Sequence, residues 1–481
     1  MEHLPQLDMR EPTAKRVEGT AERPADCDGH LPPKCLLIAL PLEILGEICS
    51  YLCSHCCYKN QDVDGLLALT KEMRAGQVAL SHLSQTCRIL SAAVQPIVFH
   101  SMVPIGNSDF HLFVRTLVER PDLRKAVFEV VIQGWSCPWA PRRQPNSSII
   151  SETIEKHLGQ GNWMPLWEVL ESGFRVKDAD IMPDRFAALF SLLLHMAPNL
   201  KRAQVVLPPP PNDLTANALS QWNGSLNLRS FNQLSLAAHN LTYGFELDEV
   251  VYMLRAMPNL EVLHCHGCTN VSEQFRDEHR IDNPPRFPNL TELTLTWNRM
   301  NELQFRNLLG AVGPRLSKFF YLQSCEGLRL DLEEALQALR PWTDTLKRLT
   351  FFYCRPNSRP DDPVPHTLRN FNALEFLEVD AISIDWSVPR VCRDAFASTL
   401  PPNICEFRVV EYAPYAPALK SLLDAVKAGR FPHLKSLELD DCNGMIEHTG
   451  ASAKKRLDRL GKQFQAAGIK WVLETPDAKT C

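Results

Sequence analysis

The sequence predicts an α/β protein in which a short N-terminal helical unit is followed by an α/β solenoid, with parallel strands on the concave side and helices on the convex side. Three observations support this prediction. From about residue 200 onward an apolar motif recurs at a nearly constant interval, helix-like stretches separate the copies, and prolines occur at the same phase of six copies. Such periodicity is typical of solenoids, in which each repeat packs against its neighbours.

The recurring motif is L-x-x-L-x-L-x-x-N/C, in which another apolar residue can replace each leucine. Its clearest copy runs from Leu290 through Leu293 and Leu295 to Asn298. Successive copies begin 26 to 31 residues apart, a period typical of leucine-rich repeats. The copies begin at Leu200, Phe231, Leu260, Leu290, Leu316, Leu346, Leu374, Ile404 and Leu434. Degenerate copies are expected at 127–132 and from Ile469.

A helix-like stretch precedes many of the copies, as between Glu302 and Val312. In six copies a proline then lies two residues ahead of the first motif position, at Pro198, Pro258, Pro288, Pro314, Pro402 and Pro432. Because proline cannot continue a helix, it marks a stop at a fixed phase. Each repeat is therefore predicted to be a helix, a turn, a short strand and a second turn.

The predicted N-terminal unit contains two amphipathic helices. Leu40 and Pro41 open the first, with Pro41 near a first helical position, where its missing N–H costs nothing. Four apolar residues then share one helical face, namely Ile44, Leu45, Ile48 and Leu52. The second helix is expected to end at Pro96, and its apolar residues are Leu80, Leu83, Cys87 and Leu90.

This helical unit resembles an F-box, in the opening Leu40-Pro41-x-Glu43-Ile44-Leu45 and the closing Leu80-x-x-Leu83-x-x-x-Cys87-Arg88-x-Leu90. The match departs from the family in its long spacer, 53–78. An F-box followed by leucine-rich repeats is a known architecture, and the chain is similar to fungal F-box proteins with divergent repeats. The resemblance implies binding of a Skp1-like adaptor, and through it a cullin, by Leu40, Pro41, Ile44, Leu45, Leu83 and Cys87.

The resemblance further implies a non-catalytic, intracellular substrate-recognition adaptor of an SCF-type (Skp1–cullin–F-box) ubiquitin ligase, cytoplasmic or nuclear. Alternatives remain open. The helical unit could instead cap the solenoid and bury the same residues internally. The whole chain could be a leucine-rich-repeat interaction scaffold independent of any ligase, or a hydrolase could be hidden in the segment 134–181.

The predicted concave face supplies a candidate site for a target protein. In L-x-x-L-x-L the inner apolar residues point into the core, so the residues between them point outward. An aromatic cluster with charged surroundings is typical of a binding hot spot. The candidate target-binding residues are Lys318, Phe320, Leu322, Arg348, Phe352, Phe376 and Glu378. A loop folded over the rings, or a register shift that turns them inward, would remove this site.

These observations divide the chain into five parts. Residues 1–34 form an expected disordered arm, because charged residues and proline dominate there. An F-box-like helical domain follows at 35–104, with an insertion at 53–78. Residues 105–199 link it to the repeats and carry the insertion 134–181, whose role the sequence does not define. The solenoid spans 200–474, and 475–481 form a tail.

Composition limits the classes of function. The 481 residues are 45% hydrophobic and 22% charged, which is typical of a folded soluble protein. A net charge of −5 argues against a dedicated nucleic-acid binder. The sequence contains no run of about 18 apolar residues, so no membrane span is predicted. The first 28 residues do not resemble a signal peptide. The 16 cysteines are therefore interpreted as thiols in a reducing compartment.

Neither catalysis nor metal binding is predicted. The sequence contains no G-x-S-x-G, H-E-x-x-H or G-x-x-x-x-G-K-[ST] motif. The segment Cys53-x-x-Cys56-Cys57, with His55 inside it and Cys49 nearby, has part of a zinc spacing. A structural zinc usually needs two separated ligand pairs, and no second pair follows at finger spacing. We therefore expect no cofactor and no metal.

Overall fold

The computed structural model describes residues 40–57, 71–102, 107–132, 189–190, 192–207, 228–272, 275, 284–324, 330, 332–352, 366–380, 395–410, 416–440 and 451–474. The predicted N-terminal arm, the insertion 134–181 and the tail lie outside these residues.

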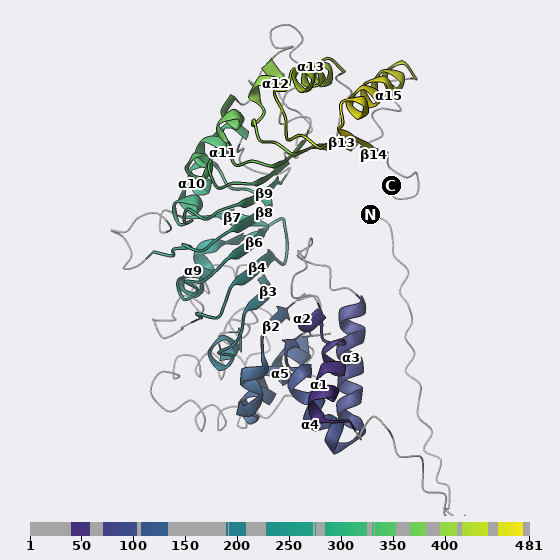
Figure 1. Cartoon of the computed structure of the whole chain (residues 1–481). Coiled ribbons are helices and arrows are strands. Elements are labelled where there is room, and N and C mark those ends of the chain that lie inside the picture. The colour runs from purple at the N-terminus through teal and green to yellow at the C-terminus, as the bar shows by residue number, and fades with distance from the viewer. Residues whose placement is uncertain are drawn as a thin grey trace, which may run out of the picture.

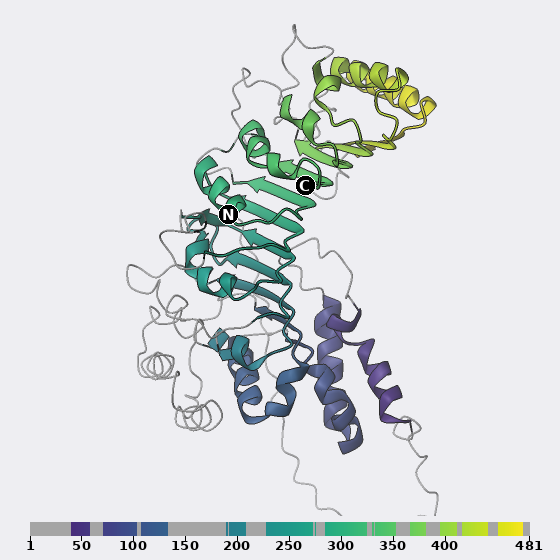
Figure 2. The ribbon, with the colours of Figure 1, turned by 60° about the vertical axis from the view of Figure 1, so that its left-hand side comes forward.

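The dominant element is a parallel sheet of twelve strands, in which the order in space follows the order in sequence. Figures 1 and 2 show this sheet as an arc with helices along its outer side and the N-terminal helices at one end. The strands are β1 (Ser101–Met102), β2 (Glu129–Ile132), β3 (Arg202–Leu207), β4 (Gln233–Ala238), β6 (Val262–His266), β8 (Glu292–Asn298), β9 (Lys318–Gln323), β10 (Arg348–Phe352), β11 (Phe376–Asp380), β12 (Glu406–Val410), β13 (Ser436–Asp440) and β14 (Lys470–Glu474).

This arrangement is the one that an α/β solenoid predicts. Each strand from β3 onward, apart from β5 and β7 of a separate two-stranded sheet, begins one or two residues after a motif start. Strands also form at 129–132 and 470–474, where degenerate copies were expected. The separate sheet pairs β5 (Phe245–Glu246) with β7 (Cys268–Asn270).

Helices connect successive strands and cover one face of the sheet (Figure 1). They pack on a continuous core formed by the inward leucines, phenylalanines and valines of the strands. The described connecting elements are α5 (Asn107–Glu119), η2 (Pro121–Ala126), η4 (Leu247–Val250), α9 (Val251–Arg255), α10 (Glu302–Gly310), α11 (Leu332–Ala338), η6 (Arg340–Trp342), η7 (His366–Asn370), α12 (Ala395–Thr399), α13 (Ala416–Lys427) and α15 (Ala451–Ala466).

The turns before the strands join neighbouring repeats through asparagine side chains. Asn259, which follows a turn proline, donates from its amide to the carbonyl of Arg229, one repeat earlier, at 2.8 Å. Asn403 makes the corresponding bond to the carbonyl of Asn372 at 2.7 Å. Each such bond supplies a hydrogen-bond donor to a carbonyl of a turn, which lies outside the hydrogen-bonded strands. The proline–asparagine pair is therefore both a helix stop and a link between repeats.

The N-terminal unit consists of α1 (Leu42–Ser50), α2 (Ser54–Cys57), α3 (Lys71–Thr86) and α4 (Arg88–Val98). Pro41 precedes the first helical residue, and its carbonyl accepts the N–H groups of Ile44 and Leu45. Helix α4 packs against both α1 and α3. A small core of five buried residues holds the unit together, namely Cys49, Cys53, Leu80, Val94 and Ile97.

The prediction of one continuous second helix ending at Pro96 was wrong. Cys87 adopts an extended backbone and separates α3 from α4. Pro96 lies inside α4, which ends two residues later at Val98. Proline removes a hydrogen bond to the preceding turn but leaves the following residues able to finish the last turn. No helix in the described part of the chain is long and apolar enough to cross a membrane.

Candidate functional site

Helix α1 and the residues beside it carry apolar side chains that the described part of the chain does not cover. Leu40 is 36% exposed and Ile44 is 48% exposed, and Pro41 beside them is exposed too. Other large apolar side chains extend this face, namely Ile48, Tyr51 and Leu52. We call these six residues the α1 face. Contiguous exposed apolar surface of this kind is typical of an interaction site.

Three of the residues expected to bind the adaptor lie differently from expectation. Leu45 is only 1% exposed and lies on the buried side of α1, so it serves the unit's own packing. Leu83 is half-buried against the small core, and Cys87 is half-buried at the break between α3 and α4. Helix α1 thus has two apolar sides, one turned toward α4 and one turned outward. Leu42, which the sequence analysis did not select, is 53% exposed at the start of the helix, although the helical period places it on the same side as Leu45 and Cys49.

The inner face of the sheet has the predicted register. Phe319, Tyr321 and Phe351 point into the core, and Phe320 and Phe352 lie on the opposite face and are half-buried. A register shift that turns the predicted rings inward is therefore absent from β9 and β10. The other alternative, a loop folded over the rings, is not tested, because the segments 353–365 and 381–394 that follow β10 and β11 lie outside the described residues.

An aromatic zone occupies the middle of this inner face. The rings of Phe320 and Phe352 meet edge to face, with 5.7 Å between their centroids. Beside them, the guanidinium of Arg348 lies 4.3 Å from the centroid of the Phe376 ring, a cation–π contact. Leu322 pairs in register with Phe352 on the neighbouring strand. Lys318 and Glu378 lie on the same strands, so the structure places all seven predicted target-binding residues on one face of β9, β10 and β11.

Toward the C-terminal end the inner face becomes acidic. Arg408 contacts three carboxylates on neighbouring strands, Glu378 at 3.2 Å, Glu438 at 3.1 Å and Asp440 at 3.4 Å. Burial raises the pKa of Glu378, although the charge of Arg408 opposes this effect. Three carboxyl groups thus surround one guanidinium, so acidic groups outnumber basic ones in this zone. Sequence analysis did not select Arg408 as a binding residue.

Toward the N-terminal end a polar zone begins with Lys318. Its ammonium lies 3.1 Å from a carboxylate oxygen of Glu292, whose other oxygen lies 3.1 Å from Nε2 of His264. The hydrogen bond from His264 and the charge of Lys318 hold the pKa of Glu292 below its usual value. Glu292 is therefore ionised and paired at neutral pH, and Lys318 is partly neutralised before any partner binds.

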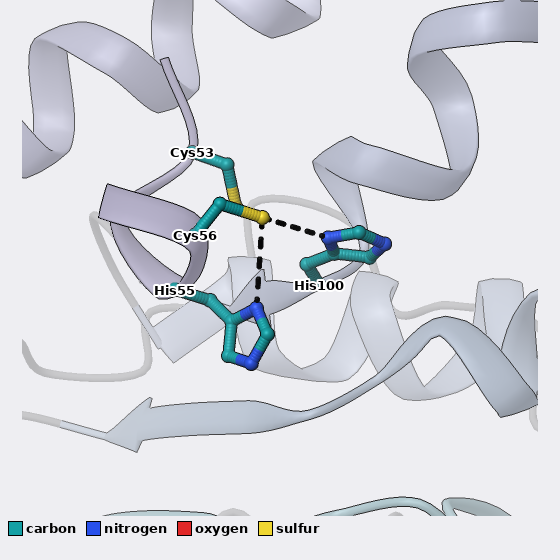
Figure 3. Close-up of side chains that lie close together, drawn as sticks. All are labelled: Cys53, His55, Cys56 and His100. Carbon is teal, nitrogen blue, oxygen red and sulfur yellow. Dashed lines mark hydrogen bonds between the residues drawn. The ribbon is translucent and has the colours of Figure 1, made fainter. Parts of the chain in front are cut away.

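A separate cluster of sulfur and nitrogen atoms lies where the helical unit meets the sheet. Cys53, His55, Cys56 and His100 place their potential ligand atoms within 4.8 Å of one another. Figure 3 shows both imidazole rings turned toward the Cys56 sulfur. His100 was missed by sequence analysis because it lies 44 residues beyond Cys56 with no recognisable spacing.

Comparison with known proteins supplies no assignment. No protein-family model matches the chain, and no curated protein matches it significantly. The residues and their arrangement therefore carry the functional proposal.

Proposed function

We propose that this chain is the substrate-recognition adaptor of an SCF-type ubiquitin ligase. In this proposal the α1 face binds a Skp1-like protein, which connects the chain to a cullin, and the inner face of the sheet binds the target protein. The chain itself performs no chemistry. The F-box resemblance supplies the identity of the first partner.

The outward apolar side of α1 is the observation that carries the proposal. Helix α1 already buries Leu45 and Cys49 against its own unit, so Ile44 and Ile48 are not needed for that packing. Complete burial of a fully exposed leucine or isoleucine side chain is worth about 1.5–3 kcal/mol, and Ile44 and Ile48, at 48% and 42% exposed, forgo part of this free energy. A partner that covers the α1 face recovers this free energy, as in other helix–groove complexes.

The inner face defines the kind of target that would fit. The edge-to-face rings of Phe320 and Phe352 offer a place for an apolar or aromatic anchor. The acidic zone around Arg408 favours a basic residue beside that anchor. We therefore infer a target segment that combines an apolar anchor with lysine or arginine.

Co-purification with a Skp1-like protein tests the first half of the proposal. The double variant Leu40→Ala with Ile44→Asp is expected to lose this association while the repeats stay folded. Leu303→Asp is the matched control, because Leu303 on α10 is 51% exposed and far from α1 in sequence. If the wild-type chain does not associate with a Skp1-like protein, a repeat scaffold independent of ubiquitin ligases becomes the better explanation.

Comparative pull-down tests the second half. Phe352→Glu should lose target proteins that the wild type and Leu303→Asp both retain, with at most a small loss of melting temperature. Retention of every partner by Phe352→Glu would exclude the aromatic zone as the target site. A large loss of stability would instead mean that this ring belongs to the core.

A further inference from the structure

Four side chains at the junction of the helical unit and the sheet form a candidate metal centre. Cys53 follows α1, His55 and Cys56 lie on α2, and His100 lies between α4 and β1. Cys53 and His55 are buried, whereas Cys56 and His100 are half-buried. We propose that Cys53, His55, Cys56 and His100 bind one zinc ion as a structural Cys2His2 site.

The interatomic distances agree with tetrahedral coordination. Nδ1 of His100 lies 3.5 Å from Sγ of Cys56, and Nδ1 of His55 lies 3.8 Å from the same sulfur. Zinc–sulfur bonds of about 2.3 Å and zinc–nitrogen bonds of about 2.0–2.1 Å give ligand–ligand distances of roughly 3.3–3.8 Å in a tetrahedron. The remaining pairs lie within 4.8 Å. Closing them to that range takes about 1 Å, which rotation of side chains can supply.

The donor set selects the metal. Two thiolates and two neutral imidazoles are the ligands of structural zinc sites, and soft sulfur excludes magnesium and calcium. Binding releases the two thiol protons, and the two thiolates then balance the charge of the ion. The neutral complex suits a site whose ligands are buried or half-buried.

The surroundings of the ligands support the same assignment. The Cys53 carbonyl accepts the N–H groups of Cys56 and Cys57 at 3.1 and 3.0 Å, and this turn holds the Cys53 and Cys56 side chains close to each other. His100 is held at the first strand, because its carbonyl accepts the N–H groups of Phe128 and Glu129 at 3.0 Å each.

The ring of Phe128 fixes both imidazoles. It stacks on His55 with 4.9 Å between the centroids and meets His100 edge to face at 5.1 Å. Metal-bound histidines are usually oriented by such surrounding contacts. The two rings are therefore held with Nδ1 directed at the Cys56 sulfur (Figure 3).

The zinc ion joins two parts of the fold. Cys53, His55 and Cys56 belong to the helical unit, and His100 leads directly into β1 of the sheet. The helical unit has a small core of five buried residues, so it gains more from a metal link than a large domain would. The site thus fixes the position of the α1 face relative to the solenoid. The inference does not depend on what that face binds.

Cobalt(II) substitution of the full chain tests the proposal. The protein is purified under reducing conditions, stripped with a chelator and titrated with Co²⁺. We expect one equivalent to bind with intense tetrahedral d–d bands and a thiolate-to-cobalt charge-transfer band, and Zn²⁺ to displace it. Cys57→Ser is the matched control, because the Cys57 sulfur points away and donates to the Tyr51 carbonyl at 3.0 Å. This variant should keep the full spectrum.

Two variants test the ligands themselves. Cys53→Ser with Cys56→Ser should abolish the charge-transfer band. Because that variant could fail to fold, Cys56→His is the second test, and it should retain the metal while roughly halving the charge-transfer intensity, since one of two thiolates remains. Absence of a thiolate band in the wild type overturns the proposal. An unchanged band in Cys56→His, or its loss in Cys57→Ser, overturns the ligand assignment.

Discussion

Replacement of two adjacent phenylalanines by alanine tests the register on which the target-binding face depends. Phe351 and Phe352 follow each other on β10 and point to opposite faces of the sheet. Phe351 has no exposed surface and stacks on Tyr321, with ring centroids 5.0 Å apart. Phe352 is half-buried and meets Phe320 edge to face. The same substitution should therefore have very different consequences at the two positions.

The magnitudes follow from burial. Truncating a fully buried phenylalanine costs about 3–5 kcal/mol, because the lost transfer free energy adds to that of the cavity left behind. Truncating Phe352 removes one edge-to-face ring pair, which is worth about 0.5–1.5 kcal/mol. It also removes the packing of a side chain that is only half-buried, which costs less than a fully buried one. We expect Phe351→Ala to be the more destabilising by about 2 kcal/mol, or roughly thirtyfold in the folding equilibrium.

Urea unfolding followed by circular dichroism measures both variants against the wild type. The difference should appear as a lower midpoint for Phe351→Ala, and Phe352→Ala should stay close to the wild type. Equal losses, or a larger loss for Phe352→Ala, would refute the assigned register. The aromatic zone would then belong to the core, and the target-binding proposal would lose its basis.

Three further predictions concern packing, titration and the links between repeats. Gly76→Ala should destabilise the helical unit by about 1–3 kcal/mol, because a Cβ there would collide with the Leu52 carbonyl oxygen. Gly46→Ala has open space and should stabilise α1 by up to about 1 kcal/mol. Equal melting temperatures of the two variants in calorimetry would contradict the close approach of α3 to Leu52. Burial raises the pKa of Glu249 to about 7 from 4.5, so the folded chain keeps a proton that the unfolded chain releases. The free energy of unfolding should therefore fall as pH rises from 4.5 to 7, by at most about 3 kcal/mol. Urea titrations at pH 5 and pH 8 measure this pH dependence, and Glu249→Gln should remove it. A pH dependence equal to that of the wild type would refute the assignment. Asn259→Ala should cost about 1 kcal/mol in the same assay through its lost bond to the preceding repeat, and an unaltered midpoint would show that this bond contributes nothing.

The sheet could be predicted from the sequence because each repeat carries its own signals. A turn proline such as Pro288 and the following Leu290, Leu293 and Leu295 fix where a strand begins and which side is buried. These are local rules of backbone conformation and alternation, and they need no knowledge of distant contacts.

The helical unit and the metal cluster could be predicted only in part. Ile44 and Leu45 are equally apolar, and only the position of α4 decides that Leu45 is buried and Ile44 is exposed. His100 meets Cys56 because α4 ends beside the first strand, a tertiary arrangement that no local spacing encodes. The expectation of no metal followed from the missing second ligand pair, and the structure supplies candidates for that pair in His55 and His100.

Isothermal titration calorimetry with a purified Skp1-like protein tests the central claim most directly. The account predicts a one-to-one complex whose affinity Ile44→Asp weakens by at least about thirtyfold, equivalent to about 2 kcal/mol, while Leu303→Asp leaves it unchanged. Absence of binding by the wild-type chain, or equal affinity for wild type and Ile44→Asp, would contradict the claim that the α1 face is the docking site.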